Sequence, residues 1–559
     1  MNEITKSITF LKEYKQLRQA VDEGKTPVLA VGLSAIHKAH LAAALGLDTG
    51  RPVLVLTDDD NAANRFAADL RGFSERDIVQ LPSRELVMAD VVGVSRGYEQ
   101  RRLAALDELT EAHFAVASVQ AAAQRTMPPE ALKAAIVSLA TGETAPLDEL
   151  AQSLTRAGYE RCVQVEGTGQ FSIRGGILDV FPPQAEHPYR VEFWDDEIDS
   201  ISTFDVGSQR RLEQCECLRC LPCMESIPAL AKGGAAGLAK AVLALTSTRR
   251  KKQHADLQTN LERDAERLRE TGSLPAADKY MPLIYPEMAT AFDYLPENAI
   301  VIIEDTPRLR DAVRDFHARV ADDVTALLER GEMPPALGEY ALDFVGVCGV
   351  KRQILRLDSF LNNVAELTPQ HLENFIANQM NAYGGNLDMA SADIRSYTEQ
   401  GRAVAVVCGS VLRCQNMLDA LTDTGLNVKI SDLLPKGGCV NIMEGTLSAG
   451  FEYPDLGLVV MTEGQVLARR KKTQVKKSNR DKVKSYTDLT PGDLVVHEHH
   501  GIGRFIGMER MTVDGSERDF IKIAFAGTDF LYVPATSLDL ISKYIGGGDN
   551  ERVRLNKLG

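Results

Sequence analysis

The residues around Gly32 have the types and spacing from which a nucleotide-binding loop could be built. They connect a short apolar run to a helical stretch, which is where a phosphate-cradling loop of pattern GxxxxGK[ST] would lie. Gly32 and Lys38 fit that pattern, but His37 stands at the second glycine and Ala39 at the hydroxyl position. A side chain at the second glycine hinders the backbone from approaching a phosphate, and alanine offers no hydroxyl to Mg²⁺. We therefore expect a degenerate loop that binds no ATP; an ordinary strand-to-helix turn is the alternative.

An acidic strand end is the second feature that could serve nucleotide chemistry. Residues 300–303 form a clear buried-strand pattern, and Glu304 and Asp305 follow it directly. In P-loop enzymes a strand ending in Asp-Glu holds Mg²⁺ and activates water. Here the order is reversed and Pro307 follows, so we interpret this end as degenerate too. A capped strand-to-helix turn explains it equally well, and we expect the strand to complete the first sheet.

Cysteine and histidine clusters indicate no metal or catalytic site. Four cysteines lie within nine residues, too tightly for four thiolates to reach one tetrahedral centre, so we expect them to pack as small apolar side chains. The run beginning at His497 lacks the second histidine of a zinc-protease helix, because Gly501 stands there. No Ser/His/Asp or Cys/His arrangement is recognisable, so we predict no catalytic and no metal-binding residue. The four cysteines are Cys215, Cys217, Cys220 and Cys223.

Length and composition bound the class of protein. The chain has 559 residues, of which 44% are hydrophobic and 25% charged. This suits a globular protein of roughly three to five domains. The sequence has no apolar run of membrane-spanning length and no secretory signal, and its nine cysteines are mostly isolated, as reduced thiols are. We expect a cytoplasmic monomer with no membrane contact.

Charge is unevenly distributed along the chain. The net charge of −15 argues against a general DNA-coating protein. Between Arg469 and Lys484, however, nine Lys or Arg stand against Asp481 alone. We predict a solvated basic linker over residues 466–484, with contact to DNA by this segment as the alternative.

Strand and helix patterns divide the chain into several domains. Apolar runs alternate with helical stretches up to residue 126, which predicts a parallel sheet with helices on both faces. Short strands with turn glycines then indicate a small α+β domain, with Asp195 and Asp196 in a turn. A mostly helical stretch, a second α/β unit and a β-rich unit that alternates like a small barrel follow. The predicted domains are residues 1–126, 127–211, 212–332 (completing the first sheet), 333–465 and 485–559.

Individual elements are predicted where apolar periodicity is clearest. The predicted helices cover residues 39–45, 62–71, 96–109, 147–157, 249–271 and 410–422. The predicted strands cover residues 28–31, 53–56, 78–81, 114–118, 162–165, 171–174, 177–181, 189–194, 198–204, 300–303, 403–407, 428–430, 440–442, 458–461, 493–497, 501–511, 520–525 and 530–533.

Two segments of the α+β domain carry a specific resemblance. Residues 169–182 read GQFSIRGGILDVFP and residues 189–201 read YRVEFWDDEIDSI. Together they resemble the small β-rich domain shared by the excision-repair protein UvrB and the bacterial transcription-repair coupling factors (the Mfd family). In both, that domain binds the damage-recognition ATPase UvrA.

A second resemblance lies near the C-terminal end. Residues 489–505 read LTPGDLVVHEHHGIGRF and residues 531–534 read LYVP. They resemble the RNA-polymerase-interacting domain of the coupling factors, which is a CarD-type, Tudor-like fold that UvrB lacks. Residues 445–451 (GTLSAGF) and 462–464 (TEG) fit the third domain of the same family.

The resemblance covers essentially the whole chain and implies its fold. It implies a multidomain α/β protein: a degenerate P-loop (RecA-like), UvrB-like module with the UvrA-binding domain inserted, a second small α/β domain, and a C-terminal CarD/Tudor-like β-barrel. In this family an ATP- and Mg²⁺-dependent translocase lies C-terminal to these domains. No second GxxxxGK[ST] appears here. We therefore expect the N-terminal part of a longer protein, without cofactor or enzymatic activity of its own.

The resemblance also implies contact residues. Guanidinium groups suit acidic patches on UvrA, and the family contacts the RNA polymerase β subunit by edge-to-edge strand pairing. Pairing with strand neighbours such as Glu192 is the alternative for the weaker UvrA candidates, and a core position is the alternative for Ile506. The predicted UvrA contacts are Arg161, Arg174, Asp179, Phe181 and Arg190, and the predicted polymerase contacts are Arg504, Ile506 and Met511.

The sequence thus predicts a non-catalytic adaptor. It would link stalled RNA polymerase to UvrA and so direct nucleotide excision repair to transcribed DNA. One alternative is a self-contained ATP-dependent DNA repair helicase, against which the degenerate loop speaks. The other is a CarD-like transcription regulator, which would not retain UvrA.

Overall fold

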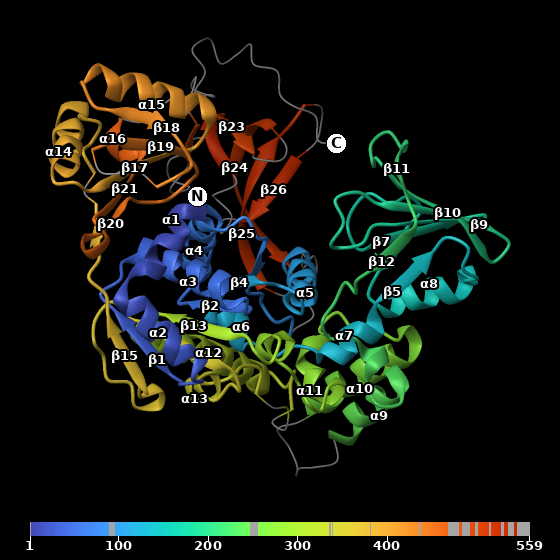
Figure 1. Ribbon diagram of the computed structural model, residues 1–559. Helices are drawn as coiled ribbons and strands as arrows, with labels where there is room; N and C mark the ends of the chain where they lie inside the picture. Colours follow the sequence, from blue (N-terminus) through green and yellow to red (C-terminus); the bar gives the residue numbers. More distant parts are fainter. Residues whose placement is uncertain are drawn as a thin grey trace. The chain divides into compact units, whose positions relative to one another are not determined.

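The computed structural model divides the chain into two compact units, Met1–Ala468 and Arg469–Gly559 (Figure 1). None of the described helices combines the length and the apolar composition needed to cross a membrane. The structure describes residues 2–88, 96–245, 255–334, 337, 339–380, 382–434, 438–467, 480–482, 492–497, 501–513, 516–526, 530–534 and 541–544.

A seven-stranded sheet in which every pairing is parallel forms the base of the first unit. Its order is β15–β1–β14–β13–β2–β4–β3. The continuous apolar runs of its central strands reflect burial on both faces. The strands are β1 (Val28–Val31), β2 (Val53–Thr57), β3 (Ile78–Leu81), β4 (Phe114–Ser118), β13 (Ile300–Glu304), β14 (Gln353–Leu357) and β15 (His371–Asn374).

Helices cover both faces of this sheet (Figure 1). Alternate residues of each strand enter different cores: Val53 and Val55 pack on one side, and Leu54 and Leu56 on the other. The first face is covered by α1 (Asn2–Ser7), α2 (Lys12–Asp22), α3 (Ala35–Thr49) and α4 (Asp60–Phe73). The second is covered by α5 (Gly97–Leu109), α6 (Val119–Ala123) and α12 (Thr306–Glu329).

The structure confirms the predicted return of residues 300–303 and corrects the boundary at residue 333. Strand β13 lies between β14 and β2 and so completes the first sheet. The sequence assigned residues 333–465 to one separate domain, but β14 and β15 belong to the first sheet as well. The assignment was wrong because Arg356 interrupts the apolar run of β14. This arginine is nevertheless buried, since its charge is compensated by an ion pair with Asp358.

The inserted domain is a six-stranded sheet of order β11–β10–β9–β8–β7–β6, with an adjoining two-stranded ladder of β5 and β12. One face of the sheet packs with α8 and the ladder into a core of its own. The elements are β5 (Val137–Ala140), α8 (Leu147–Arg156), β6 (Glu160–Arg161), β7 (Gln170–Arg174), β8 (Ile177–Val180), β9 (Tyr189–Trp194), β10 (Glu197–Phe204), β11 (Arg211–Cys215) and β12 (Cys217–Cys220).

Two details of this domain differ from the sequence predictions. The domain does not end at residue 211, because β11 pairs with β10 and β12 pairs with β5. Residues 162–165 are not a strand; the short strand β6 precedes them. The apolar residues that suggested a strand here do not share one buried face: Val165 is buried, whereas Val163 is exposed. The turn at Asp195 and Asp196 is confirmed.

A buried ionic network fixes the root of the inserted domain. Glu225, just beyond the domain, accepts hydrogen bonds from Thr126 Oγ1, just before it, at 2.5 Å and from Arg84 Nε at 2.8 Å. Arg102 Nε lies 3.1 Å from the same carboxylate, and Arg84 also binds Asp278. The two chain segments that enter and leave the domain are therefore tied to one another and to the first sheet.

Apart from β11, β12 and β13, the described part of residues 212–332 is mostly helical, as expected. Its helices are α9 (Gly234–Ala244), α10 (Ala255–Thr271), α11 (Met281–Ile284) and α12, and the shorter helices α7 (Pro129–Ala135) and α13 (Phe344–Cys348) flank this region in sequence. The part of the predicted helix 249–271 before residue 255 lies outside the described residues.

A third sheet completes the first unit, with order β16–β20–β21–β17–β19–β18. Strands β17, β18, β19 and β21 are parallel, as in an α/β domain, and the antiparallel β20 and β16 follow at one edge. The elements are β16 (Asn378–Gln379), α14 (Leu387–Glu399), β17 (Ala403–Cys408), α15 (Val411–Asp423), β18 (Val428–Ile430), β19 (Val440–Glu444), β20 (Phe451–Tyr453), β21 (Leu458–Thr462) and α16 (Glu463–Val466).

The second unit contains one antiparallel sheet of order β22–β27–β23–β24–β25–β26. Most of the predicted basic linker lies outside the described residues, but β22 falls within it. Closure of the sheet into a barrel stays a prediction. The strands are β22 (Arg480–Lys482), β23 (Leu494–His497), β24 (Gly501–Val513), β25 (Ser516–Ala524), β26 (Phe530–Pro534) and β27 (Ile541–Tyr544).

Candidate functional site

The outer face of the six-stranded sheet carries a row of charged side chains. Side chains alternate across a strand, so Leu178 and Val191 enter the domain core while Asp179 and Arg190 lie on the opposite face. Asp179 and Arg190 are cross-strand partners, and the Arg190 guanidinium donates to both carboxylate oxygens of Asp179 at 2.7 and 2.9 Å. This bond raises the pKa of Arg190. Because Asp179 is buried, this ion pair holds the two strands together and offers little surface to a partner.

Arg174 is the more accessible partner of the same carboxylate. Its Nη2 donates to Asp179 Oδ2 at 2.7 Å, yet half of its side chain is exposed, compared with 15% for Arg190. Arg161 is exposed at the edge strand β6. Phe181 is buried, so its ring is not presented to a partner in this conformation. Of the five predicted UvrA contacts, Arg161 and Arg174 are thus the two with accessible side chains.

Three residues of this face were not among the predicted UvrA contacts: Glu192, Trp194 and Arg211. On β9, Glu192 pairs with Arg211 of β11, which lowers the pKa of the Glu192 carboxyl, and Ser200 Oγ also donates to it. Trp194 ends β9 and is largely exposed. The alternation of residues 190, 192 and 194 along one strand was the available signal, since it places all three on the face of Arg190.

The degenerate loop packs against the chain itself. Gly32 has a φ of 84°, and a Cβ built there would lie 2.2 Å from the carbonyl oxygen of Phe375. A glycine is therefore required by a close backbone approach within the protein. Ser34 precedes α3, and its Oγ lies 2.7 Å from Nδ1 of His37.

An aromatic cluster covers the first turns of α3. The His37 ring lies edge-on to Phe451 and Tyr453 of the third sheet, with centroids 5.4 and 5.1 Å away. His40 stacks on Phe73 at 4.7 Å. Burial lowers the pKa of His37 to about 4 and that of His40 to about 3, so both rings are neutral at pH 7.

Hydrogen bonds fix the tautomer of His40 within this cluster. Its Nε2 faces the carbonyl oxygens of Ile4 and Thr5 at 2.9 and 3.0 Å and must carry the proton. Its Nδ1 then accepts from the Tyr453 hydroxyl at 3.2 Å. The site at which the loop pattern would bind phosphate is thus filled by a buried aromatic cluster that joins α3 to the third sheet.

The other residues of the nucleotide pattern have structural roles. Lys38 is buried, and its Nζ lies 4.0 Å from Oε1 of Glu304. Burial raises the pKa of Glu304, and the nearby Lys38 partly offsets this shift. Asp305 caps α12 by accepting from the Arg308 amide, which is the helix-capping alternative stated for it. Ala39 is buried in the core.

The loop that resembles the family's third domain also fastens the two α/β sheets together. Asp69 on α4 accepts from the Ser448 amide at 2.8 Å and from its hydroxyl at 2.7 Å. A Cβ on Gly72 would lie 2.3 Å from the carbonyl oxygen of Thr446. This contact is therefore tight as well as polar.

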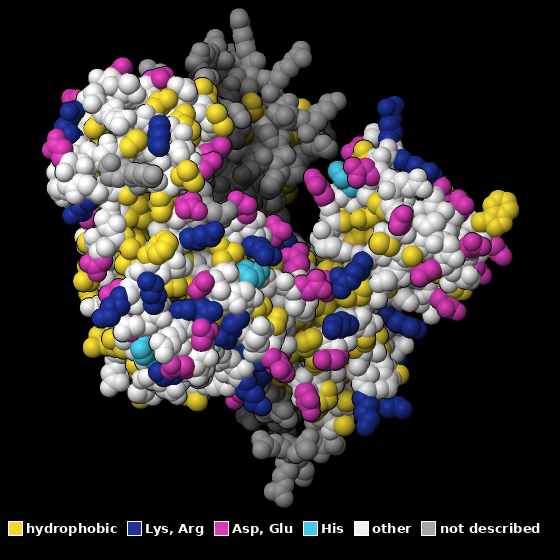
Figure 2. Space-filling model, viewed as in Figure 1, with side chains coloured by type: hydrophobic (Ala, Val, Ile, Leu, Met, Phe, Trp, Pro, Cys, Tyr) yellow, Lys and Arg dark blue, Asp and Glu magenta, His cyan; other side chains and the backbone are white. Residues whose placement is uncertain are grey.

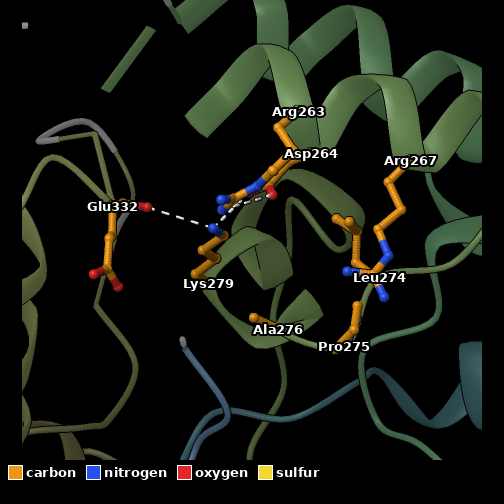
Figure 3. Close-up of a pocket in the computed structure, with 8 residues that line it drawn as sticks. All are labelled: Arg263, Asp264, Arg267, Leu274, Pro275, Ala276, Lys279 and Glu332. Atoms are coloured by element: carbon orange, nitrogen blue, oxygen red, sulfur yellow. Dashed lines mark hydrogen bonds and ion pairs between the residues drawn. The ribbon is translucent and has the colours of Figure 1, made fainter. Parts of the chain in front are cut away.

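Two hollows on the described surface lack the groups of an active site. Figure 3 shows a pocket of about 20 Å³ in which Lys279 points to Asp264 and to the Glu332 carbonyl, at 2.6 and 3.4 Å. Its volume admits about one water molecule. A groove of about 890 Å³ lies beside Arg71 and Leu433 and has mainly polar lining residues.

Cysteines form no metal centre among the described residues. No group of three or more His, Cys, Asp or Glu side chains there is placed to hold an ion. Cys220 and Cys223 are buried, as predicted for packing residues, whereas Cys215 is partly buried and Cys217 is exposed, so the prediction holds for two of the four. Burial raises the pKa of the Cys220 thiol to about 12, which disfavours the thiolate a metal requires.

The second unit presents two of its three predicted contacts on β24. Arg504 is exposed, and its neighbour Phe505 is in the core. The pairing of β24 with β25 shifts register around Ile506, which is exposed and not in the core. Met511 pairs in register with Arg518, but its side chain lies outside the described residues.

Family comparisons match both interaction domains. The sequence model described as UvrB interaction domain matches residues 137–225, and the one described as CarD-like/TRCF RID domain matches residues 489–545. The first match spans β5 to β12, in agreement with the structural bounds of the inserted domain and not with the predicted end at residue 211.

Relatives with curated names match the chain along nearly its whole length. The transcription-repair-coupling factor of Bacillus subtilis (strain 168) is 32% identical over 99% of this chain and 48% of its own length. Those of Staphylococcus epidermidis (strain ATCC 12228) and Staphylococcus aureus (strain USA300) are 27% and 26% identical over 97% and 99% of this chain. The chain spans about half the length of the curated relatives it matches.

Proposed function

Because this chain is a homologue of the transcription-repair-coupling factors over nearly all of its length, we propose that it is their adaptor region, which binds RNA polymerase and recruits UvrA. The observation that carries this proposal is the presence of two recognition domains in one chain, a UvrB interaction domain and a CarD-like/TRCF RID domain. Recruitment of UvrA to polymerase would direct excision repair to transcribed DNA, in the cytoplasm.

The UvrA side of the proposal rests on the charged outer face of the inserted sheet. Arg174 keeps half of its side chain exposed while Asp179 fixes its orientation, so it is preorganised to receive a carboxylate. Arg161 adds a second exposed guanidinium at the sheet edge. Figure 2 shows basic and acidic side chains interspersed on the visible surface, which favours a specific protein contact over general DNA binding.

The polymerase side rests on the antiparallel sheet of the second unit. In strand addition, main-chain hydrogen bonds supply affinity and side chains supply specificity. Exposed Arg504 and Ile506 beside the irregularity in β24 are suited to supply that specificity to the β subunit.

We further propose that this chain has no ATPase activity. Its nucleotide-like loop contacts Phe375, Phe451 and Tyr453, and Lys38 is buried beside Glu304. The ATP-dependent motor of the family would lie outside this chain.

Isothermal titration with purified UvrA tests the first contact. Wild-type chain should bind, and Arg174→Ala should weaken binding about 5- to 30-fold, as loss of a charge-assisted interface bond does. Arg314→Ala is the matched control, since Arg314 is an exposed, ion-paired arginine of α12 in the same unit. Absence of binding by the intact chain would refute the UvrA role.

Titration with the polymerase β subunit tests the second contact. Ile506→Asp should weaken this binding and leave UvrA binding unchanged, whereas Arg174→Ala should do the reverse. Equal loss of both bindings in either variant would indicate general unfolding, and a polymerase affinity unaffected by Ile506→Asp would remove this residue from the interface.

A further inference from the structure

Trp194 is the single tryptophan of the chain, and it is 81% exposed. Tryptophan is seldom left so open, because its large apolar ring gains free energy on burial. It stands at the end of β9, where a two-residue turn leads to β10, and Asp195 in that turn has a φ of 58°. Figure 2 shows a hydrophobic side chain projecting at the outer edge of the region that β9 and β10 occupy in Figure 1.

The hairpin that carries Trp194 is held rigidly. Trp194 and Glu197 are cross-strand partners. The segment before α8 braces the turn, since the Ala145 amide donates to the Asp196 carbonyl at 2.7 Å and the Gly142 amide donates to the Ile198 carbonyl at 2.8 Å. The ring is therefore presented by an ordered backbone, so its immobilisation on binding costs little conformational entropy.

Trp194 also lies at the same end of the same sheet face as Arg174. The register places Glu192 opposite Ile177, and the Phe193 amide donates to the Gly176 carbonyl at 2.8 Å, so the end of β9 adjoins the β7–β8 turn that follows Arg174. Arg211 begins β11 opposite Phe204, at the other end of β10, but its half-exposed side chain reaches back to pair with Glu192, two residues from Trp194 on the same face. Exposed tryptophan beside exposed arginines is the composition of interface hot spots.

We propose that Trp194 is an aromatic anchor of the UvrA interface, inserted into an apolar pocket of UvrA that is flanked by carboxylates facing Arg174 and Arg211. This inference rests on the proposed UvrA-binding function. It extends the contact surface from the predicted arginines across the whole outer face to the β9–β10 hairpin.

The single tryptophan makes the proposal directly testable. A chain labelled with 5-fluorotryptophan gives one ¹⁹F resonance, and this resonance reports on residue 194 alone. On titration with UvrA it should shift or broaden at the stoichiometry of binding. Trp194→Ala should weaken binding about 30-fold or more, as hot-spot truncation does, and Trp194→Phe should retain most of the affinity.

Phe360→Ala serves as the matched control, because Phe360 is a similarly exposed aromatic residue elsewhere in the same unit. It should leave UvrA affinity and the ¹⁹F spectrum unchanged. If UvrA binds while the resonance and the Trp194→Ala affinity stay unchanged, the anchor is refuted and the adaptor function stands. If UvrA does not bind the wild-type chain, the proposed function fails and the anchor fails with it.

Discussion

The Arg190 guanidinium spans Asp179 and Phe204: it donates to both oxygens of the Asp179 carboxylate, and its Cζ lies 4.5 Å from the centre of the Phe204 ring. Arg190 is thereby held against the sheet, whereas Arg174 shares the same carboxylate through one nitrogen and remains half exposed. The two arginines should differ accordingly, Arg190 in stability and Arg174 in binding.

Removal of the shared carboxylate should destabilise the inserted domain. Asp179→Ala leaves the largely buried Arg190 without its partner, so we expect the free energy of unfolding to fall by about 2–4 kcal/mol. Arg174→Ala should cost at most about 1 kcal/mol, because its side chain is half exposed. Urea denaturation measures both, and equal costs would contradict the assigned difference.

Gly32 and Gly142 provide a matched pair for the degenerate loop. Both have a φ of 84°, but a Cβ would lie 2.2 Å from the Phe375 carbonyl oxygen at Gly32 and would meet nothing within 4 Å at Gly142. Substitution by alanine should cost about 1–2 kcal/mol at Gly142 from backbone strain alone. At Gly32 the clash should add about 1–3 kcal/mol. Similar denaturation midpoints for the two variants would show that the approach is not tight.

Acid should weaken the aromatic cluster through His37 and His40. Both rings have lowered pKa values, about 4 and about 3, so they stay neutral in the folded chain as pH falls below 6.5. The unfolded chain takes up these protons first, so its free energy falls relative to that of the folded chain. Stability from this source is complete above pH 6.5 and decreases by about 1.4 kcal/mol per pH unit per histidine towards pH 4.

Denaturation at pH 7, 6 and 5 isolates this effect by comparison of variants. His40→Gln should lower stability at pH 7, through lost packing, and should reduce the slope of stability against pH by about 1.4 kcal/mol per unit. Phe10→Ala, at an exposed position without a titrating group, should leave the slope unchanged. An unaltered slope in His40→Gln would mean that the ring is protonated in the folded chain.

The root of the inserted domain should be sensitive to charge. Glu225→Gln removes the fully buried carboxylate that binds Arg84 and lies 3.1 Å from Arg102, so we expect a loss of about 3–5 kcal/mol in unfolding free energy. Glu149→Gln, on the exposed face of α8, should change it by less than about 0.5 kcal/mol. A neutral outcome for Glu225→Gln would mean that the network is not needed to fix this junction.

Sequence reasoning located elements best where local patterns were strong. Apolar runs such as those of β1 and β4 placed strands at their observed bounds. Strand β15 escaped prediction because it lies at an edge, half-exposed, and has mixed polarity. The boundary at residue 333 was wrong because Arg356 interrupts the apolar run of β14, and because sheet membership depends on pairing that a single strand does not reveal.

The site was predictable in kind but not in arrangement. The residue types at His37 and Ala39 indicated that the nucleotide loop had lost its chemistry, a reading that titration with ATP has still to test. What fills the loop could not be foreseen, because Phe451 and Tyr453 lie more than 400 positions away in sequence. Likewise, Asp179 was predicted as a surface contact, and only the cross-strand register shows that it is buried between two arginines.

The antiparallel pairing of β5 with β12 brings the first and last strands of the inserted domain together. The chain therefore enters and leaves the inserted domain at points about one strand spacing apart, near 5 Å. For the rest of the chain, the inserted domain is equivalent to a long loop between two neighbouring points. Its insertion or removal therefore does not require the seven-stranded sheet to repack. Geometry of this kind allows the same domain to be carried by otherwise different host proteins.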